Sequence, residues 1–167
     1  MEYAAARGDI AAVKWLRVTR SEGCSTHAID IAARQGHITV VQWLSENRSE
    51  GCSTLAMDGA AAMGYLDMLK WFHDLVGAPC TTHAMAWAAE NDRHDVVEWL
   101  HRNRSEGCTE AAMDAAAGRV DWHADFGELE IVQWLKFFYL GLFDVSAVRG
   151  YAATRAWPSA IAQTLEL

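Results

Sequence analysis

The chain has 167 residues, 51% of them apolar, and a formal net charge of −8. That length allows one domain with a hydrophobic core, and that apolar fraction excludes a disordered chain. An acidic surface repels phosphate groups, which argues against nucleic acid and membrane as partners. No apolar run approaches the roughly 20 residues that cross a bilayer, and the start of the chain lacks the layout of a secretory signal. We therefore expect an intracellular protein, cytoplasmic or nuclear.

One pattern recurs along the chain with a period of 28 residues. The heptapeptide RSEGCST occurs at 20–26 and 48–54, and RSEGCTE follows at 104–110. Tryptophan recurs in every unit, at Trp15, Trp43, Trp71, Trp99 and Trp134, and each full unit begins with a cysteine, Cys24, Cys52, Cys80 or Cys108. The period predicts a repeat array over 1–136. It consists of a partial unit at 1–23 and units at 24–51, 52–79, 80–107 and 108–136, the last with an insertion near 118–126. Residues 137–167 lack the pattern and are expected to form a divergent hydrophobic tail or cap.

Each unit is expected to form two short helices. In the unit at 24–51, the first helix is predicted from about 26 to 35, where Ser25 or Thr26 caps its start and Gly36 ends it. The second helix is predicted from about 38 to 47, with apolar residues at helical spacing. A helix of about ten residues is not stable alone in water, so each pair has to bury its apolar face on the next pair. The predicted fold is all-α, a helical solenoid of about five stacked pairs.

Three segments carry a resemblance to a known family. AARGDIAAVKWL, AARQGHITVVQWL and AAAMGYLDMLKWF resemble the core of the ankyrin repeat, and the resemblance covers about residues 1–136. It implies a stack of helix pairs with a concave binding surface. Two features depart from the family pattern: STHAID, STLAMD and TTHAMA replace the usual T-P-L-H opening, and the unit is about five residues shorter than usual. We therefore expect a tight turn in place of the projecting β-hairpin between repeats.

The cysteine column predicts neither disulfides nor a metal site. Stacked helix pairs lie about 8–10 Å apart, whereas a disulfide needs Cα atoms less than about 7 Å apart. Zinc needs ligands that converge on one point, and a column along a rod diverges. The cysteines are therefore expected to be reduced packing residues, and the tryptophans are expected to pack between units. Motifs for catalysis or cofactor binding are missing, so we expect neither an enzyme nor a cofactor.

Another column holds Asp30, Asp58 and Asp114, with Ala86 as the exception. Ankyrin repeats usually carry the histidine of the T-P-L-H opening at this place. The resemblance therefore implies that these carboxylates hydrogen-bond N–H groups of neighbouring loops. Catalysis by paired carboxylates is not expected, because identical units at a fixed spacing do not converge on one substrate atom.

Residues that vary between units indicate a binding surface. The position before the Ala-Ala pair faces the concave surface in ankyrin repeats, and here it holds Ile31, Gly59, Trp87 and Ala115. Trp87 is the outlier, and tryptophan is a frequent anchor at interfaces. The other candidate partner-binding residues on these helices are His27, Arg34, Gln35, Met63, His83, Glu90 and Asn91. The alternative is that Trp87 only fills the space left by Gly59 in the neighbouring unit.

The insertion and the two ends of the chain are less regular. The insertion GRVDWHADF is expected to be a recognition loop with Trp122 and Phe126 as anchors. It also holds Asp121, His123 and Asp125, the residues that a metal site would use. The tail is expected to fold back as a cap or to drive self-association. Both ends suggest a piece of a longer array or a truncated product.

The leading hypothesis is a non-catalytic protein–protein interaction module that binds a partner through its concave helix face. The acidic array favours a partner protein with a basic or mixed surface. One alternative is a passive spacer or a fragment of a larger repeat protein. A more remote alternative is a metal-dependent enzyme that uses the insertion at 118–126.

Overall fold

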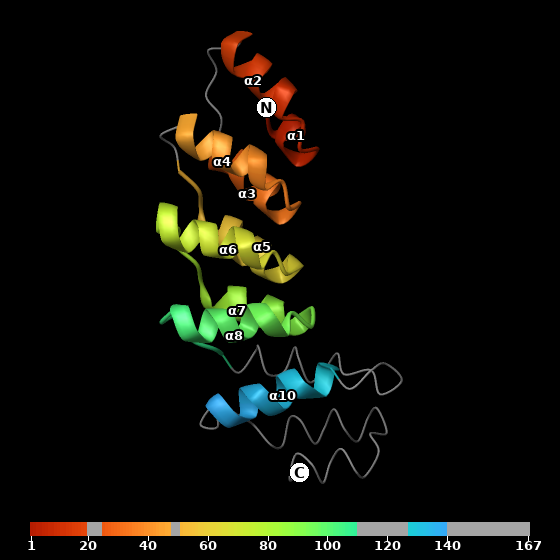
Figure 1. The fold of residues 1–167 in the computed structure, drawn as a ribbon, viewed down its shortest axis with the longest axis vertical. Coiled ribbons are helices and arrows are strands. Elements are labelled where there is room, and N and C mark those ends of the chain that lie inside the picture. The colour runs from red at the N-terminus through yellow and green to blue at the C-terminus, as the bar shows by residue number, and fades with distance from the viewer. Residues whose placement is uncertain (20–24, 48–50, 110–126, 140–167) are drawn as a thin grey trace.

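Helix pairs follow one another along the long axis of the molecule (Figure 1). The computed structural model describes residues 1–19, 25–47, 51–109 and 127–139, and these residues contain no strand. The pairs are α1 (Glu2–Ala6) with α2 (Ile10–Thr19), α3 (Thr26–Arg34) with α4 (Ile38–Asn47), α5 (Thr54–Met63) with α6 (Leu66–Trp71), and α7 (Thr82–Glu90) with α8 (His94–Asn103). A π-helical turn, η1 (Phe72–Val76), extends α6, and α10 (Gly127–Phe138) comes after α8. The predicted all-α helical repeat is confirmed.

A left-handed residue separates the two helices of each pair. Gly36 has a φ of +80°, which glycine adopts at little cost. The His37 N–H donates to the Ala32 carbonyl at 2.9 Å and so closes the end of α3. The predicted end of the first helix at Gly36 is confirmed. At the equivalent place after α7 the chain has Asp92, which holds a φ of +56° without being glycine.

Buried aspartates connect each first helix to the start of the next one. Asp30 and Asp58 are only 6% and 2% exposed. Asp30 accepts the Ser53 N–H at 3.1 Å and the Ser53 hydroxyl at 2.7 Å. Asp58 accepts the Thr81 N–H at 2.9 Å and the Thr81 hydroxyl at 2.8 Å. The implied hydrogen bonds from loop N–H groups to these carboxylates are therefore confirmed.

The hydroxyl residues that meet these carboxylates also begin the first helices. Ser53 and Thr81 each accept a backbone N–H two residues further on, at 3.1 Å. The predicted cap on α3 is wrong, because Ser25 makes no side-chain cap bond and its hydroxyl donates to Glu2 Oε1 at 2.6 Å. Glu2 holds the place of the aspartates one unit earlier. Glu2 accepts a hydrogen bond only from the Ser25 hydroxyl, through Oε1. Asp30 and Asp58 each accept the backbone N–H as well as the hydroxyl of the residue that caps the next helix.

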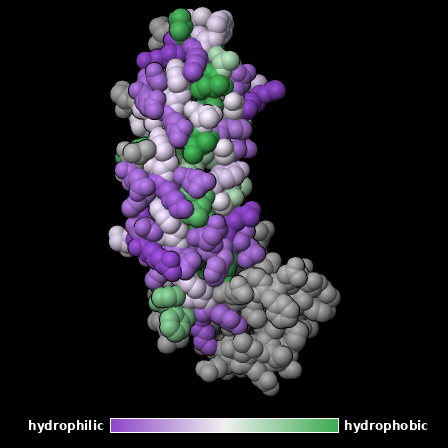
Figure 2. Space-filling view, in the orientation of Figure 1, coloured by the Kyte–Doolittle hydropathy of each residue, from purple (hydrophilic) through white to green (hydrophobic). Residues whose placement is uncertain are grey.

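The first helices stack on one another, α1 on α3, α3 on α5, and α5 on α7. Alanines fill most of their buried positions, which lets the backbones approach closely. The second helices supply the larger buried side chains; these include Val40, Val41, Leu44, Leu69, Phe72, Val97 and Leu100. One long face of the stack, shown in Figure 2, is largely hydrophilic with separate hydrophobic residues along it.

The tryptophan column is only partly buried. Trp43, Trp71, Trp99 and Trp134 pack against the core, as predicted. The prediction is wrong for Trp15, which is 63% exposed. The reason lies in what covers the column: His73 of the preceding pair meets the Trp99 ring edge-on, with ring centroids 5.5 Å apart. Trp15 belongs to the first pair, so no preceding pair of this chain lies against it.

The described cysteines are free thiols, and Cys80 and Cys108 are buried. Burial raises the pKa of both thiols to about 11. Cys52 is partly buried, and burial together with the charge of Asp30 raises its pKa as well. Cys24 lies outside the described residues.

The R-S-E-G loop after α8 contains an ion pair between two of its own residues, Arg104 and Glu106. The Arg104 guanidinium donates to Glu106 Oε1 at 2.6 Å and to the Ala78 carbonyl of the preceding loop at 3.4 Å. The two side chains are only 16% and 27% exposed. Burial raises the pKa of the Glu106 carboxyl, but the hydrogen bond and charge of Arg104, together with a backbone hydrogen bond, outweigh burial, so that pKa lies below its usual value. This loop and the one at 77–81 contain no strand, in keeping with the expected loss of the hairpin.

Helix α10 runs past the predicted end of the array at 136 and finishes at Phe138. None of the described helices is long and apolar enough to cross a membrane. The insertion residues Asp121 to Phe126, with Trp122 among them, the first helix of the unit at 108–136, and the tail beyond 139 lie outside the described residues.

Candidate functional site

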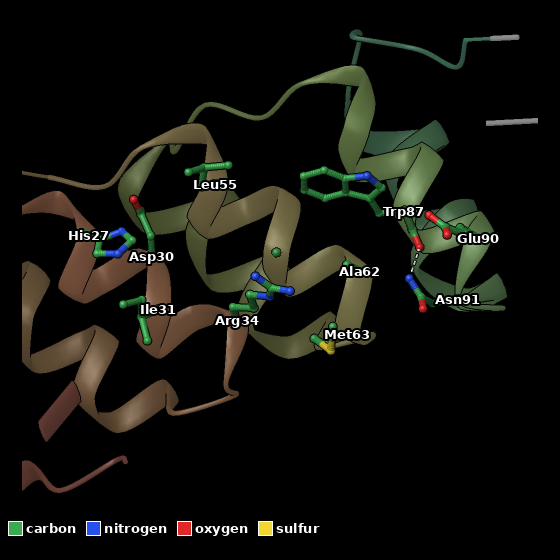
Figure 3. A pocket seen from close by; sticks show the side chains of 11 residues that line it. His27, Asp30, Ile31, Arg34, Leu55, Ala62, Met63, Trp87, Glu90 and Asn91 are labelled. Atoms are coloured by element: carbon green, nitrogen blue, oxygen red, sulfur yellow. Dashed lines mark hydrogen bonds between the residues drawn. The ribbon is translucent and has the colours of Figure 1, made fainter. Parts of the chain in front are cut away.

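A pocket of about 440 Å³ crosses three stacked helices, α3, α5 and α7 (Figure 3). Its lining consists of His27, Asp30, Ile31 and Arg34 from α3, Leu55, Gly59, Ala62 and Met63 from α5, and Trp87, Glu90 and Asn91 from α7 and its end. The second helices contribute nothing to this lining. The pocket therefore belongs to the face that the first helices share.

The hollow exists because one repeat column loses its side chain in the middle helix. Ile31, Gly59 and Trp87 occupy equivalent places in α3, α5 and α7. Because Gly59 has no side chain, Ile31 and Trp87 are the two members of this column that contribute a side chain to the pocket. A Cβ built on Gly59 would lie 3.2 Å from Arg34 Cβ, and the three nearest atoms all belong to Arg34. The Arg34 stem is thus the nearest neighbour of this position, and Trp87 lines the pocket from α7.

The Trp87 side chain is half-buried and held in place by its own helix. Its ring lies 5.2 Å from the His83 ring, one turn earlier. Its carbonyl accepts the Asn91 side-chain N–H at 2.8 Å, the bond drawn in Figure 3. His83 is itself held by the Thr81 hydroxyl at 3.0 Å from Nδ1. The indole is therefore already positioned at the pocket wall.

Apolar groups dominate the pocket between its charged residues. Leu55 is 51% exposed, and Ile31, Ala62 and Met63 add further apolar surface. The Asp30 carboxylate is already bound by Ser53. The Arg34 guanidinium, by contrast, has no hydrogen-bond or ion-pair partner among the described residues, although its stem lies against Gly59.

The predicted partner-binding residues fall into two groups. Those that line the pocket are His27, Ile31, Arg34, Met63, Trp87, Glu90 and Asn91. His83 touches Trp87 from outside the lining, Gln35 is exposed at the end of α3 and does not line the pocket, and Trp122 lies outside the described residues. The prediction omitted Asp30, Leu55, Gly59 and Ala62 from the site. The pattern that would have found Leu55, Gly59 and Ala62 is the repeat itself, because they stand in the same columns as His27, Ile31 and Arg34.

The geometry can now be compared with known proteins. The sequence profile of ankyrin repeats (many copies) matches residues 1–45 and 29–73. This part of the chain, residues 1–73, belongs to the ankyrin repeat family. Helices α7 and α8 continue the ankyrin stack beyond the matched residues. No curated protein matches the chain.

Ankyrin repeats generally act as protein-interaction modules and are typically non-enzymatic scaffolds. Within the described part of the chain, no group of three or more His, Cys, Asp or Glu side chains is arranged to hold a metal ion. The pocket presents apolar side chains, the Trp87 indole and the Arg34 guanidinium.

Proposed function

We propose that this ankyrin repeat stack is a non-catalytic binding module, and that its partner is a protein held on the face of α3, α5 and α7. One observation carries the proposal: the pocket that spans these helices is lined by residues that differ between otherwise similar repeats. Buried positions keep the same residue types from unit to unit, as the alanines and Asp30 and Asp58 show. Variation concentrated around one hollow is what a recognition surface requires.

The physical properties of the face suit a protein partner. A tryptophan beside an apolar hollow is a typical anchor at protein interfaces. The stacked first helices form a rigid wall, so little conformational entropy is lost when a partner docks. The net charge of −8 favours a partner whose surface is basic or mixed in charge, because complementary charge speeds association.

Affinity capture from cells that express the protein tests the proposal. Four immobilised proteins are compared: wild type, Trp87→Ala, Leu55→Glu and Trp15→Ala. Trp15→Ala is the control, because it also removes an indole but lies on α2, away from the pocket. Circular dichroism and thermal unfolding check that each variant is folded.

We expect partners to be lost with Trp87→Ala and Leu55→Glu and retained with Trp15→Ala. Leu55→Glu keeps the test decisive if Trp87→Ala unfolds the protein, since Leu55 is exposed and its replacement leaves the core intact. Capture that is unchanged by both pocket variants would refute the site. Capture of no partner by wild type would favour a passive spacer.

A further inference from the structure

We infer that the pocket takes one large apolar side chain of a partner polypeptide, and that a carboxylate close to that side chain in the partner pairs with Arg34. The inference rests on the proposed function and adds the chemistry of the partner. It names the two features of a binding segment that the pocket would select, an apolar anchor and a neighbouring acidic residue.

The apolar half of the inference follows from the shape of the pocket. The pocket is lined by Gly59, by Leu55 and Met63 from the same helix, and by Trp87 from the neighbouring helix α7. A volume of about 440 Å³ is ample for one large side chain together with part of its backbone. Burial of such a side chain favours binding, and contact with the indole adds to this.

The charged half follows from what docking would do to Arg34. Its guanidinium is solvated now and has no partner among the described residues. A segment that fills the pocket would remove water from this cation, and an unpaired buried charge is costly. The pocket lining holds two carboxylates, and neither is paired with Arg34, because Asp30 accepts two hydrogen bonds from Ser53 and Glu90 takes part in another interaction. The compensating anion must therefore come from the partner, and arginine binds a carboxylate with two parallel hydrogen bonds.

The absence of a side chain at position 59 sets the depth of the hollow. Alanine there would place a methyl group in the pocket floor, 3.2 Å from Arg34 Cβ, so the arginine stem would have to shift by a few tenths of an ångström. Gly59 lies inside α5 and has no positive φ, so alanine raises the helix propensity at this position. Gly59→Ala is therefore a variant that reduces the pocket while leaving the fold at least as stable.

A phage-displayed library of random linear peptides, selected on the wild-type protein, provides the test. The enriched sequence is synthesised, and its Kd is measured for wild type, Arg34→Glu, Gly59→Ala, Trp87→Ala, Leu55→Glu and Arg17→Glu. Arg17→Glu is the matched control, because it makes the same charge change on an exposed site of α2. A second peptide carries lysine in place of the acidic residue.

We expect the selected peptides to share a large apolar residue with Asp or Glu nearby. Arg34→Glu should weaken binding about 10- to 100-fold, as expected for loss of a charge-assisted hydrogen bond, and Arg17→Glu by less than about 3-fold. Gly59→Ala should weaken binding at least about 3-fold without lowering the melting temperature. The lysine peptide should bind Arg34→Glu more tightly than it binds wild type.

The outcomes separate this inference from the proposed function. Binding that depends on Trp87 and Leu55 but not on Arg34 or on the acidic residue overturns the inference and leaves the proposed site intact. Peptides that bind equally well to Trp87→Ala and Leu55→Glu contradict both. Failure to enrich any peptide also overturns the inference, since it would mean that no single linear segment fills the pocket.

Discussion

The first and second helices of each repeat differ in the side chains that they bury and in their contribution to the pocket. The first helices, α3, α5 and α7, pack through alanines and carry the varied side chains of the pocket. The second helices, α4, α6 and α8, bury valine, leucine and phenylalanine and contribute no pocket residue. A substitution in the second helices should therefore alter stability, whereas a substitution on the pocket face of the first helices should alter binding. The following predictions test this division.

The largest effect is expected from the second layer. Phe72 is fully buried at the end of the second helix of its repeat. Phe72→Ala should lower the free energy of unfolding by about 3–5 kcal/mol, because it removes the ring and leaves a cavity. Urea denaturation measures the change. Val18→Ala on α2 is the control, since Val18 is exposed, and should change stability by less than about 0.5 kcal/mol. Similar losses for the two variants would break the proposed division.

The next effect concerns the link between neighbouring first helices. Asp58→Ala removes the acceptor for the Thr81 N–H and hydroxyl, and we expect a loss of about 2–3 kcal/mol in the free energy of unfolding. Asp58→Asn keeps an oxygen for the N–H and should lose less. A loss below about 0.5 kcal/mol for Asp58→Ala would show that the carboxylate column is not structural.

A smaller effect is expected from the R-S-E-G loop. Arg104→Ala leaves the Glu106 carboxylate largely buried without its guanidinium partner, so stability should fall by about 2 kcal/mol. Arg102→Ala breaks the more exposed pair with Glu98 and should cost less than about 0.5 kcal/mol.

Because the folded-state pKa of Glu106 is lowered, its stabilisation is present above the ordinary carboxyl pKa and is lost as the pH falls through the folded pKa. The difference between wild type and Arg104→Ala should therefore shrink in acid, and a constant difference would contradict this role.

The smallest effect is expected from the buried thiols. Burial raises the folded-state pKa of Cys80 and Cys108 to about 11, so their contribution to stability is complete below the ordinary thiol pKa and is lost as the pH rises through about 11. In native protein, alkylation of either residue should be slow at neutral pH and increase toward that value. Mass spectrometry of iodoacetamide-treated protein over a pH series measures the rates. Rapid alkylation of Cys80 at neutral pH, at the rate of the unfolded chain, would show that the thiol is not held in the core.

Most of the helices could be predicted from the sequence, because their ends and their buried faces depend on residues close together in the chain. Gly36 and the helix that follows it are found from turn chemistry and apolar spacing alone, and the structure agrees. Predictions failed where the outcome depends on a neighbouring unit. Ser25 turns to Glu2 rather than capping its helix, and Trp15 has no preceding pair of this chain against it.

The candidate site was predictable in its columns but not in its shape. Trp87, Ile31 and Arg34 could be named because they vary between repeats. The hollow lined by Gly59 could not, since its shape depends on the Arg34 stem, which lies against the glycine from the neighbouring helix. How a side chain of one unit lies against the next unit is decided by packing, and the repeat pattern does not predict it.

Hydrogen–deuterium exchange of the protein with and without the partner recovered by affinity capture tests the location of the binding face most directly. We predict that partner binding slows amide exchange in α3, α5 and α7, and that α4, α6 and α8 exchange as before. Protection confined to the second helices, with α3, α5 and α7 unchanged, would contradict binding at the pocket over Gly59.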